Sequence, residues 1–553
     1  MVGVEEDDMS LPAFVLWVLT AVQLLGGHLC SSLKWRLMLW AVIVGVWGWQ
    51  LGHDVILASM VPVYFLLGAL FVRDGLLAVQ QRQSTHHAFK KTWIKWVGLV
   101  FGSFLLLIPL VEAAILPFDT VDYSRRSLTA AFEQMHRTLQ TRYPFGEWKQ
   151  IDWDALYAEH YPAVVEAQST GDEAGYYVAL RKYLFSLPDG HVWLDGPLHD
   201  ELKTAVIGGG FGFAVIQLND GRVIAHIIEP FGPADRAGMT WGAEIIRWDG
   251  VDVDTAVSSQ PILWASRPPA TAQNLAITQQ HLLTRAPVGS ERTVTFRNIG
   301  ASEAQTVTLT AYNDQFKMYD QSILGEWPSQ PQEPVQFQIL DNKIGYLKIL
   351  ALDPNSKGES SGDAVADAMA LMIEQEAKAI IIDVRGNRGG LDTVVPLMMS
   401  NLTPTRLHYE GITHYMPIFD DFRRLTSLYV NPGELQFTNP VFVLIDHRSK
   451  SSGEGFGLIA QSLPHVQTVG MYSTDGSFGM SAASILMPNG IKLFYPWGQS
   501  LDEAGVIQVE GNHQLQGGIQ PDVVIPLTFE TAQLIYLEGE DVVLDFVVSD
   551  LLR

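Results

Sequence analysis

The serines that follow one apolar run are the first residues of this chain that could do chemistry. The run from Val441 to Asp446 leads into Ser449, Ser451, Ser452 and Gly453, and a helical pattern follows. A serine at the junction of a buried strand and a helix can act as a nucleophile, because amides at the helix start can hold an oxyanion. The same serines could instead cap the helix, since a serine hydroxyl accepts hydrogen bonds from orphan amides.

A second candidate is the histidine in the sequence LPDGHVWL. His191 follows a Pro-Asp-Gly turn, and a lone histidine in a turn is most often a surface residue. Next to a serine, however, a neutral imidazole can accept the serine proton and return it to a leaving amine. The interpretation of His191 therefore depends on whether the fold brings a nucleophile to it.

Two predicted strands end in loops where such residues could meet. The stretch AKAIIIDVRGNRGG is typical of a buried strand that runs into a glycine turn with Gly389 and Gly390, and VFVLID is a second buried strand before the serines. Helical patterns separate the strands, which predicts a mainly parallel sheet with helices on both faces. Ligands bind beyond the carboxyl ends of such strands, so both loops should converge. We interpret Asp383, Arg385 and Asn387 as residues that hold the glycine turn.

Residues 204–313 have the pattern of a small β-rich module with a helical insertion. Apolar and polar residues alternate through short runs, and Asn219-Asp220-Gly221 marks a hairpin turn. This stretch resembles a PDZ domain, and the residues that match its carboxylate-binding loop are Gly210, Phe211, Gly212 and Phe213. The resemblance implies that a peptide C-terminus binds along an edge strand. A phosphate-binding loop is the alternative, but the strand-to-helix context that it requires does not follow.

The N-terminal residues differ from the rest by their long apolar runs. We predict about four transmembrane helices here, at Leu11–Cys30, Leu37–Leu51, Val55–Val72 and Val97–Leu116. The second run is the shortest and could be an interfacial segment. Basic residues gather in the loops after the first and third runs, so the positive-inside rule places these loops in the cytoplasm and everything after Leu116 outside it. The sequence MVGVEEDDMS lacks the positive start of a signal peptide.

Composition argues against a nucleic-acid binder and against a fold that depends on disulfides or a structural metal. The chain has 553 residues and a formal net charge of -24. A general nucleic-acid binder needs a basic face, so we expect no nucleic-acid partner. The single cysteine, Cys30, leaves nothing for an intramolecular disulfide, and no Cys/His cluster offers the ligands of a structural metal. We therefore expect neither a metal nor another cofactor.

The order of the motifs resembles the serine peptidases of the tail-specific (carboxyl-terminal-processing) and tricorn-like family. LPDGHVWL and the PDZ-like module come first, and IIIDVRGNRGG, SKSSGE, TVGMYSTDGSFG and GGIQPDVVIP follow, over the range Asp119 to Leu527. The resemblance implies a crotonase-like (ClpP/crotonase-type) α/β core. It also implies cleavage of peptide bonds, often near unstructured C-termini.

The resemblance assigns a role to several residues. The family's nucleophile precedes the Glu of a Ser-x-x-Glu pattern and falls on Ser451, with Ser452 and Gly389 or Gly390 as donors to the oxyanion. The tail-specific branch activates its serine with a lysine, but the matching position here is Ser477. The tricorn-like branch uses a histidine ahead of the PDZ module. That position falls on His191.

The resemblance implies Glu510 as the acid behind this histidine. The sequence departs from the family pattern here, because Gly190 stands where the best-known tricorn members have a serine that bridges to the acid, and NHQLQ is inserted after Glu510. Other groups therefore stay open for this role, namely Asp502, Glu503 and His513. Two lysines remain alternative bases, namely Lys450 and Lys492.

Together these observations predict an α/β crotonase-like core with an inserted β-rich PDZ domain, preceded by an all-α transmembrane region. The expected parts are a transmembrane region (1–117), a helical part with His191 (118–203), the PDZ-like domain (204–313), a linker (314–335), the peptidase core (336–535) and a C-terminal tail (536–553). We expect a membrane-anchored serine endopeptidase that cleaves protein substrates outside the cytoplasm, with the lipid bilayer and peptide C-termini as partners. The alternative is a non-catalytic peptide-binding receptor or scaffold.

Overall fold

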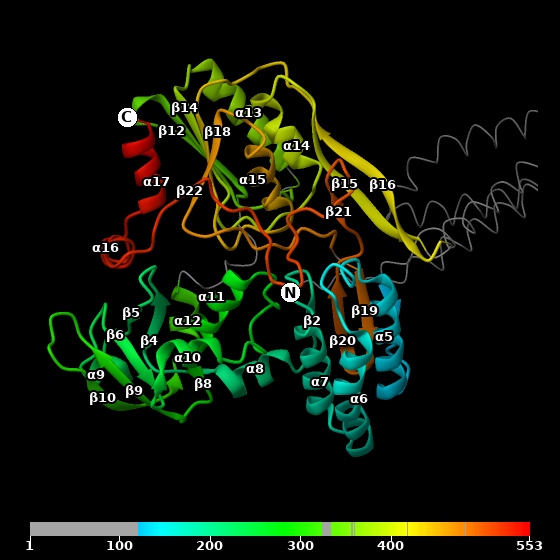
Figure 1. Cartoon of the computed structure of the whole chain (residues 1–553), viewed down its shortest axis with the longest axis vertical. Helices are drawn as coiled ribbons and strands as arrows, with labels where there is room; N and C mark the ends of the chain where they lie inside the picture. The colour runs from blue at the N-terminus through cyan, green and yellow to red at the C-terminus, as the bar shows by residue number, and fades with distance from the viewer. Residues whose placement is uncertain are drawn as a thin grey trace, which may run out of the picture. The chain divides into compact units, whose positions relative to one another are not determined.

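The computed structural model describes residues 120–322, 333–354, 358, 360–416, 419–481 and 483–552 (Figure 1). The predicted transmembrane segments within residues 1–117 lie outside this range. Inside it, no helix is both long enough and apolar enough to cross a membrane. Asp119–Tyr415 and Asp420–Arg553 form one compact unit, and the contacts described below lie within it.

The C-terminal half is built on a six-stranded sheet with the order β12-β13-β14-β17-β18-β22. The pairs from β13 to β22 are parallel, and β12 is antiparallel to β13. The mainly parallel sheet predicted from alternating strands and helices is therefore confirmed. The strands are β12 (Val335–Leu340), β13 (Ile344–Ile349), β14 (Ala379–Asp383), β17 (Val441–Leu444), β18 (Val466–Gly470) and β22 (Val523–Val524).

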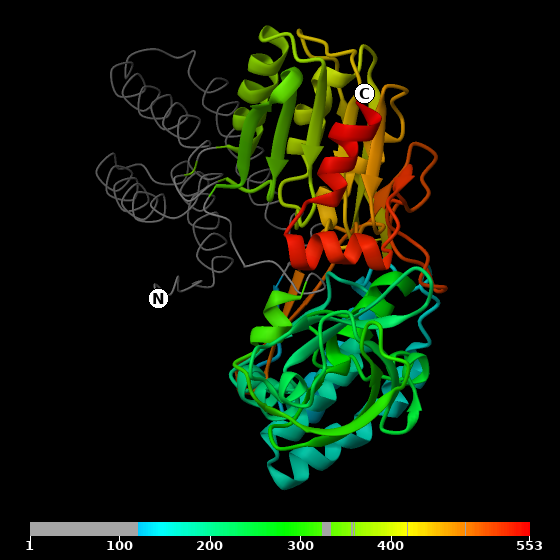
Figure 2. The ribbon, with the colours of Figure 1, turned by 90° about the vertical axis from the view of Figure 1, so that its left-hand side faces the viewer.

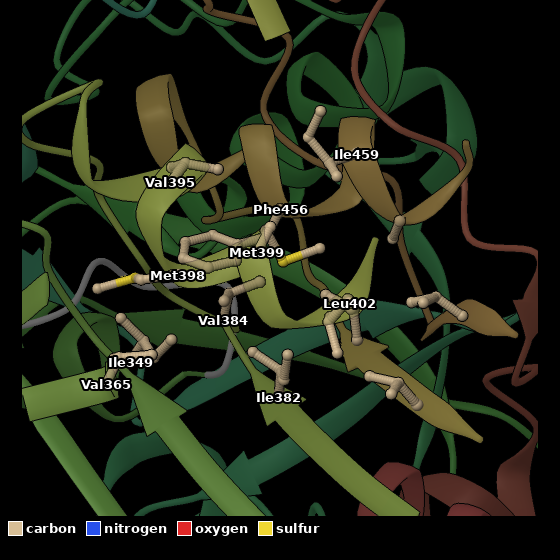
Figure 3. Close-up of a cluster of buried hydrophobic side chains, with 14 of the residues drawn as sticks. Ile349, Val365, Ile382, Val384, Val395, Met398, Met399, Leu402, Phe456 and Ile459 are labelled. Atoms are coloured by element: carbon tan, nitrogen blue, oxygen red, sulfur yellow. The ribbon is translucent and has the colours of Figure 1, made fainter. Parts of the chain in front are cut away.

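One face of this sheet is covered by three helices. Ile380 and Ile382 of β14 point to this face and pack in one cluster with Val365, Met399 and Phe456 from the helices (Figure 3). Burying an aliphatic or aromatic side chain in this way contributes roughly 1.5–3 kcal/mol. The helices are α13 (Ser361–Glu374), α14 (Val394–Met399) and α15 (Gly455–Ala460).

The opposite face is covered by the C-terminal residues. Successive side chains of a strand point to opposite faces, so Ile381 points away from Ile380 and Ile382. Ile381 packs with Val543 of α17 (Val542–Phe546) and Val547 of η6 (Val547–Leu551). Figure 2 shows the C-terminal helices, in red, in front of the sheet. The residues expected as a C-terminal tail thus include helical turns that bury apolar surface on the sheet. Before them lie α16 (Phe529–Gln533) and η5 (Leu534–Glu538).

The residues before the β-rich module form the predicted helical part. Each of its three main helices begins after a side chain that accepts a hydrogen bond from a helix amide, at Ser127, Asp152 and Asp172. These helices bury aromatic and aliphatic side chains such as Phe132 and Tyr183. They are α5 (Leu128–Arg142), α6 (Trp153–Thr170) and α7 (Glu173–Phe185), and the short α8 (His199–Ile207) follows.

A four-stranded sheet links this helical part to the C-terminal half. Its order is β1-β19-β20-β2, so the hairpin β19 (Ala483–Met487) and β20 (Ile491–Tyr495) lies between β1 (Thr120–Asp122) and β2 (Trp193–Asp195). The indole of Trp193 stacks on Phe494 at 4.2 Å between ring centroids. Because only Val192 separates His191 from β2, this pairing carries the histidine to the C-terminal half.

Residues 204–313 form a β-rich module. Its main sheet has the order β10-β9-β6-β5-β4, with β7 paired to β6, and a smaller sheet has the order β11-β3-β8. The strands are β3 (Gly209–Gly210), β4 (Phe213–Gln217), β5 (Val223–Ile228), β6 (Glu244–Trp248), β7 (Val251–Asp252), β8 (Arg285–Ala286), β9 (Glu291–Arg297), β10 (Gln305–Thr310) and β11 (Tyr312–Asn313). The helices are α9 (Pro233–Arg236), α10 (Val253–Ser258), α11 (Ala272–Leu283) and, after β11, α12 (Lys317–Gln321).

The predicted carboxylate-binding loop connects β3 to β4 in this module. Phe211 and Phe213 are buried, and Gly212 has a φ of +80°. β4 is the last strand in the order of the main sheet, and α11 lies beside it, where Gln280 Oε1 accepts a hydrogen bond from the Gln217 amide at 2.9 Å. The loop thus joins a strand of the smaller sheet to the end strand of the main sheet.

A long hairpin completes the C-terminal half. It consists of β15 (Leu407–Met416) and β16 (Asp421–Val430), and the short strand β21 (Ser500–Leu501) pairs antiparallel with β15. The Ser500 hydroxyl donates a hydrogen bond to Glu410 Oε2 at 2.7 Å. This bond fixes the hairpin base to the segment that leads to Glu510.

Candidate active site

Ser451 begins a single helical turn, η3 (Ser451–Gly453), after β17. Its φ is +54°, in the left-handed region that L-residues with a side chain rarely adopt. Its amide donates to the Ser477 carbonyl at 2.9 Å, and its own carbonyl accepts from the Glu454 amide at 2.8 Å. The surrounding backbone therefore holds Ser451 in a strained conformation, of a kind that gathers at active sites.

The interpretation of these serines as helix caps is wrong. Neither η3 nor α15 has a side-chain hydrogen bond at its N-cap. The Ser449 hydroxyl donates to the Val384 carbonyl at 2.8 Å, and the Ser452 hydroxyl donates to the Gly390 carbonyl at 3.0 Å and to Asp392. Both hydroxyls thus tie the nucleophile loop to the residues that follow β14.

The glycine turn after β14 packs directly on the nucleophile. A Cβ on Gly389 would lie 2.6 Å from Ser451 Cβ, and Gly389 has a φ of +90°. The Gly389 amide donates to Asn387 Oδ1 at 2.8 Å, and the Asn387 carbonyl accepts from the Lys450 amide at 2.9 Å. Asn387 thus holds the turn, as predicted. Because the Gly389 amide is engaged, Gly390 and Ser452 are the better placed of the three predicted oxyanion donors.

The charged residues at the end of β14 have structural partners. Asp383 accepts hydrogen bonds from the Tyr346 hydroxyl at 2.7 Å and from Arg385 Nη2 at 2.6 Å. Arg385 also binds Asp541, at the start of α17, at 2.7 Å. The guanidinium therefore links the end of the strand to the helix that covers it. Asp383 and Arg385 thus have structural partners, as predicted, but these partners fix the strand end to α17 and not to the glycine turn.

Gly389→Ala should lower kcat/KM by about 100-fold, because the new methyl group displaces Ser451 and an error of about 1 Å in a reacting group costs that much. The matched control is Gly221→Ala. Gly221 has nearly the same φ, +89°, but no described atom lies within 4 Å of its Cβ position. Both variants bear the same backbone strain, so a steady-state assay isolates the contact with Ser451. Equal activity of the two variants would contradict this account of the turn.

Ser451 and His191 line one cavity of about 810 Å³. The glycines of both loops, Gly190, Gly389 and Gly390, also line it. Such a volume is typical of sites that enclose a ligand. No hydrogen bond joins Ser451 to His191 among the described residues, and catalytic hydrogen bonds are often long in unliganded enzymes. The fold therefore brings the two predicted residues to the same cavity without a hydrogen bond between them among the described residues.

His191 is almost fully buried, with 3% of its surface exposed. Its amide donates to Asp189 Oδ1 at 2.7 Å, while its Nδ1 has no hydrogen-bond partner among the described residues. Burial disfavours the charged imidazolium and lowers the pKa of His191 to about 4, although the nearby Asp189 opposes this effect. The imidazole is therefore neutral at pH 7, which is the form that a general base requires.

The acid limb of the pH profile should reflect this low pKa. We expect kcat/KM to fall with an inflection near pH 4 rather than near 6.5, because His191 stays neutral until then. Stability changes over the same window. A histidine whose pKa is lower in the folded state stabilises the fold above pH 6.5, and this contribution is lost as pH falls towards 4. Circular dichroism at each pH identifies where the fold persists, and an inflection near 6.5 in folded protein would contradict the prediction.

Glu510 does not contact the imidazole. Its carboxylate binds Lys149 Nζ at 2.7 Å and accepts from the Phe478 amide at 2.7 Å, and both charged side chains are almost fully buried. Burial raises the pKa of Glu510 above its usual range, and Lys149 opposes this effect. Lys149 Nζ also donates to the Pro188 carbonyl at 2.7 Å. Glu510 thus reaches the turn that carries His191 through Lys149, a link that no sequence signal indicated.

The other groups left open by the sequence have different places. Lys450 lines the cavity. Lys492 lies on β20 opposite Asp195 and is not among the residues that line the cavity. The residues that line the cavity also do not include the three alternatives to Glu510, namely Asp502, Glu503 and His513. Of the two candidate lysines, Lys450 is therefore the one with a position from which it can act in this cavity.

Lys149→Met should destabilise the protein by about 3 kcal/mol, because it leaves the Glu510 carboxylate buried without its cation. The double variant Lys149→Met/Glu510→Gln should lose less, since neither charge remains. Thermal unfolding of the single and double variants measures this difference. A double variant that unfolds at a lower temperature than Lys149→Met would contradict the assignment of a buried ion pair.

Several residues of the site were not predicted from sequence patterns. Asn274 of α11 donates to Asp475 Oδ1 at 2.7 Å, and both residues line the cavity. Arg267 donates to the Gly190 carbonyl at 2.9 Å and lies over the Trp193 ring at 4.2 Å. Asn274 and Arg267 belong to the helical insertion of the β-rich module. This insertion therefore forms one wall of the cavity.

Comparisons with known proteins find two related proteases. The chain is 24% identical over 377 residues to tricorn protease homolog 2 of Streptomyces coelicolor, which covers 64% of this chain and 28% of that protein. It is 23% identical over 359 residues to the carboxy-terminal processing protease CtpB of Bacillus subtilis, which covers 62% of each chain. The chain thus spans under a third of the first relative and under two thirds of the second.

A solved structure and a protein family add to this result. The crystal structure of mature CPAF has a TM-score of 0.54 with 15% sequence identity, over 75% of this chain and 95% of that one, which shows a shared fold. Residues 343–525 match peptidase family S41. These matches support a serine peptidase. The similarity to peptidase family S41 thus covers residues 343–525 of this chain.

Proposed function

We propose that this chain is a serine endopeptidase in which Ser451 is the nucleophile and His191 the general base. The observation that carries the proposal is the single cavity that both residues line, beside a glycine turn that packs on Ser451. Ser451 Oγ bonds to the scissile carbonyl carbon while its proton moves to His191. The C–N bond then breaks as His191 returns the proton to the leaving amine, and water hydrolyses the acyl-enzyme by the same route.

Two further parts of the site have roles in this mechanism. The amides of Gly390 and Ser452 stabilise the oxyanion of the tetrahedral intermediate. Glu510 supports His191 indirectly, because the ion pair with Lys149 fixes the Pro188 carbonyl at the start of the Asp189-Gly190-His191 turn. This assignment replaces a direct Glu510–His191 bond with a link through a buried lysine.

The remaining parts of the chain fit a membrane-anchored peptidase. The N-terminal apolar runs anchor it, and their flanking charges favour a catalytic part on the periplasmic or extracellular side. The β-rich module acts as a PDZ domain on a crotonase-like core, with the loop Gly210–Phe213 receiving substrate C-termini beside β4. A reporter enzyme that is active only outside the cytoplasm, fused to the C-terminus, tests the orientation. An inactive reporter on a correctly inserted chain would contradict it.

One observation favours a second function, that of a peptide-binding receptor without catalysis. His191 Nδ1 has no hydrogen-bond partner among the described residues, so no acid orients the imidazole in this state. The deciding experiment is incubation of the purified full chain in detergent with an unstructured protein such as casein. The peptidase proposal predicts fragments of the substrate. Binding of the substrate without any cleavage would favour the receptor.

A further inference from the structure

Ser477 lies buried between the two loops that carry the proposed nucleophile and base. Its carbonyl oxygen accepts a hydrogen bond from the Ser451 amide at 2.9 Å. Its hydroxyl oxygen accepts one from the Gly190 amide, also at 2.9 Å. Because Gly190 directly precedes His191, one residue contacts the backbone of both catalytic loops.

A buried carboxylate fixes the loop of Ser477 to the nucleophile. Glu454 accepts hydrogen bonds from the Thr474 hydroxyl at 2.5 Å and from the amides of Gly476 and Ser477 at 2.8 and 3.1 Å. The Glu454 amide in turn donates to the Ser451 carbonyl at 2.8 Å. Several hydrogen bonds to one carboxylate in a dry environment hold their donors firmly. The Ser477 hydroxyl therefore occupies a fixed place relative to Ser451.

The Ser477 hydroxyl also fills the space that a side chain at residue 190 would need. A Cβ on Gly190 would lie 2.6 Å from Ser477 Oγ and 2.7 Å from Asp475 Oδ2. Asp475 cannot move away freely, because Asn274 holds its carboxylate at 2.7 Å. Residue 190 is thus confined to glycine by its neighbours, and not by a left-handed backbone.

The position of the imidazole depends on this backbone anchor. Hydrogen bonds hold the peptide groups on both sides of Gly190. The Ser477 hydroxyl accepts from the Gly190 amide, and Arg267 donates to the Gly190 carbonyl, each at 2.9 Å. The imidazole Nδ1 itself has no partner among the described residues, so no side-chain bond compensates for a shift of the loop. A shift of about 1 Å in a catalytic group can lower the rate about 100-fold.

We infer that Ser477 is a positioning residue for the reaction. Its hydroxyl accepts the hydrogen bond of the Gly190 amide and so sets the distance between the His191 imidazole and Ser451. A side chain at residue 190 could not take over this role, because its neighbours leave no room for one. The inference rests on the proposed function, because it assumes that Ser451 and His191 react together.

The test compares Ser477→Ala with Ser473→Ala in the full chain. Ser477→Ala removes the acceptor of the Gly190 amide and leaves the backbone bond to Ser451 intact. Ser473 is the matched control, because its hydroxyl is also buried in the same loop but has no hydrogen-bond partner among the described residues. We expect Ser477→Ala to lower kcat and the rate of Ser451 labelling by a fluorophosphonate about 10- to 100-fold, with KM within threefold. Ser473→Ala should match the wild type.

The outcomes separate the inference from the proposed function. If the wild type neither cleaves nor labels, the proposed function fails and this inference falls with it. If the wild type reacts and folded Ser477→Ala labels within twofold of its rate, only the positioning role is overturned. A Ser477→Ala variant that changes only KM would also overturn the positioning role. Should Ser477→Ala fail to fold, Ser477→Cys fills the space with a slightly larger atom that is a weaker acceptor. A folded Cys variant with slower labelling supports the role, and one with the wild-type rate overturns it.

A double-mutant cycle tests the steric part of the argument. Gly190→Ala alone should react more slowly than Ser477→Ala, because its methyl group meets the Ser477 hydroxyl. Gly190→Ala/Ser477→Ala should label faster than Gly190→Ala alone but more slowly than Ser477→Ala, since the clash with the Ser477 hydroxyl is removed while the contact with Asp475 Oδ2 remains. A double variant slower than both single variants would contradict the steric relation between the two positions.

Discussion

Ser451→Ala should lower kcat by about 10⁴-fold or more, because no other group at this position can form the acyl-enzyme. The fold should persist. The hydroxyl takes no part in the backbone hydrogen bonds of residue 451. Its amide donates to the Ser477 carbonyl, and its carbonyl accepts from the Glu454 amide. Cleavage of an unstructured protein, measured together with thermal unfolding, separates the loss of chemistry from a loss of structure.

A second serine in the same loop provides the control. Ser449 is fully buried, and its hydroxyl donates to the Val384 carbonyl at 2.8 Å. Ser449→Ala should cost about 1–2 kcal/mol of stability and leave the chemical step largely intact, because a buried acceptor loses its donor. Ser451→Ala should therefore lose activity and keep its stability, whereas Ser449→Ala should lose stability and keep its activity. Retained cleavage by Ser451→Ala would mean that the nucleophile lies elsewhere.

His191→Gln should lower kcat about 10²- to 10⁴-fold, the range by which a positioned general base contributes. Glutamine resembles histidine in size and can hydrogen-bond, but it cannot accept the serine proton. The residual activity should rise with pH, because hydroxide replaces the missing base. The wild type should show no such rise, since its imidazole is already neutral above about pH 4. A pH profile of both proteins measures this difference.

The control for this variant is another buried histidine. His226 lies in β5 of the β-rich module, with its Nε2 3.2 Å from the Ser322 hydroxyl and 1% of its surface exposed. His226→Gln should affect stability without changing the shape of the pH profile. A His191→Gln variant that keeps wild-type kcat and pH dependence would rule out a base at this position. Lys450 would then be the candidate, because its side chain lines the same cavity.

Local sequence patterns predicted the parts of the fold that depend on neighbouring residues. The three- and four-residue spacing of Leu128, Phe132, Met135 and Leu139 predicts α5, and the apolar run before Asp383 predicts β14. The convergence of the glycine turn and the serine loop followed from the parallel order of their strands, because parallel strands end at one edge of the sheet. These features follow from periodicity and from general rules of sheet topology.

The features that sequence patterns did not predict all depend on contacts between distant residues. The pairing of β2 with β20, which brings His191 to the site, joins short strands that no periodicity connects. The partner of Glu510 is Lys149, a single lysine in the turn between α5 and α6. The serine hydroxyls were expected at helix amides but bind a carbonyl and a carboxylate of the neighbouring turn. Each outcome was decided by tertiary packing.

The most direct measurement is the rate and position of covalent labelling by a fluorophosphonate in the full chain. Peptide mass spectrometry of the wild type should find one adduct, on Ser451. The adduct should be absent in Ser451→Ala and should form at least 100-fold more slowly in His191→Gln, because the serine then lacks its base. An adduct on another residue, or equal labelling rates in the wild type and His191→Gln, would contradict a mechanism in which these two side chains act together.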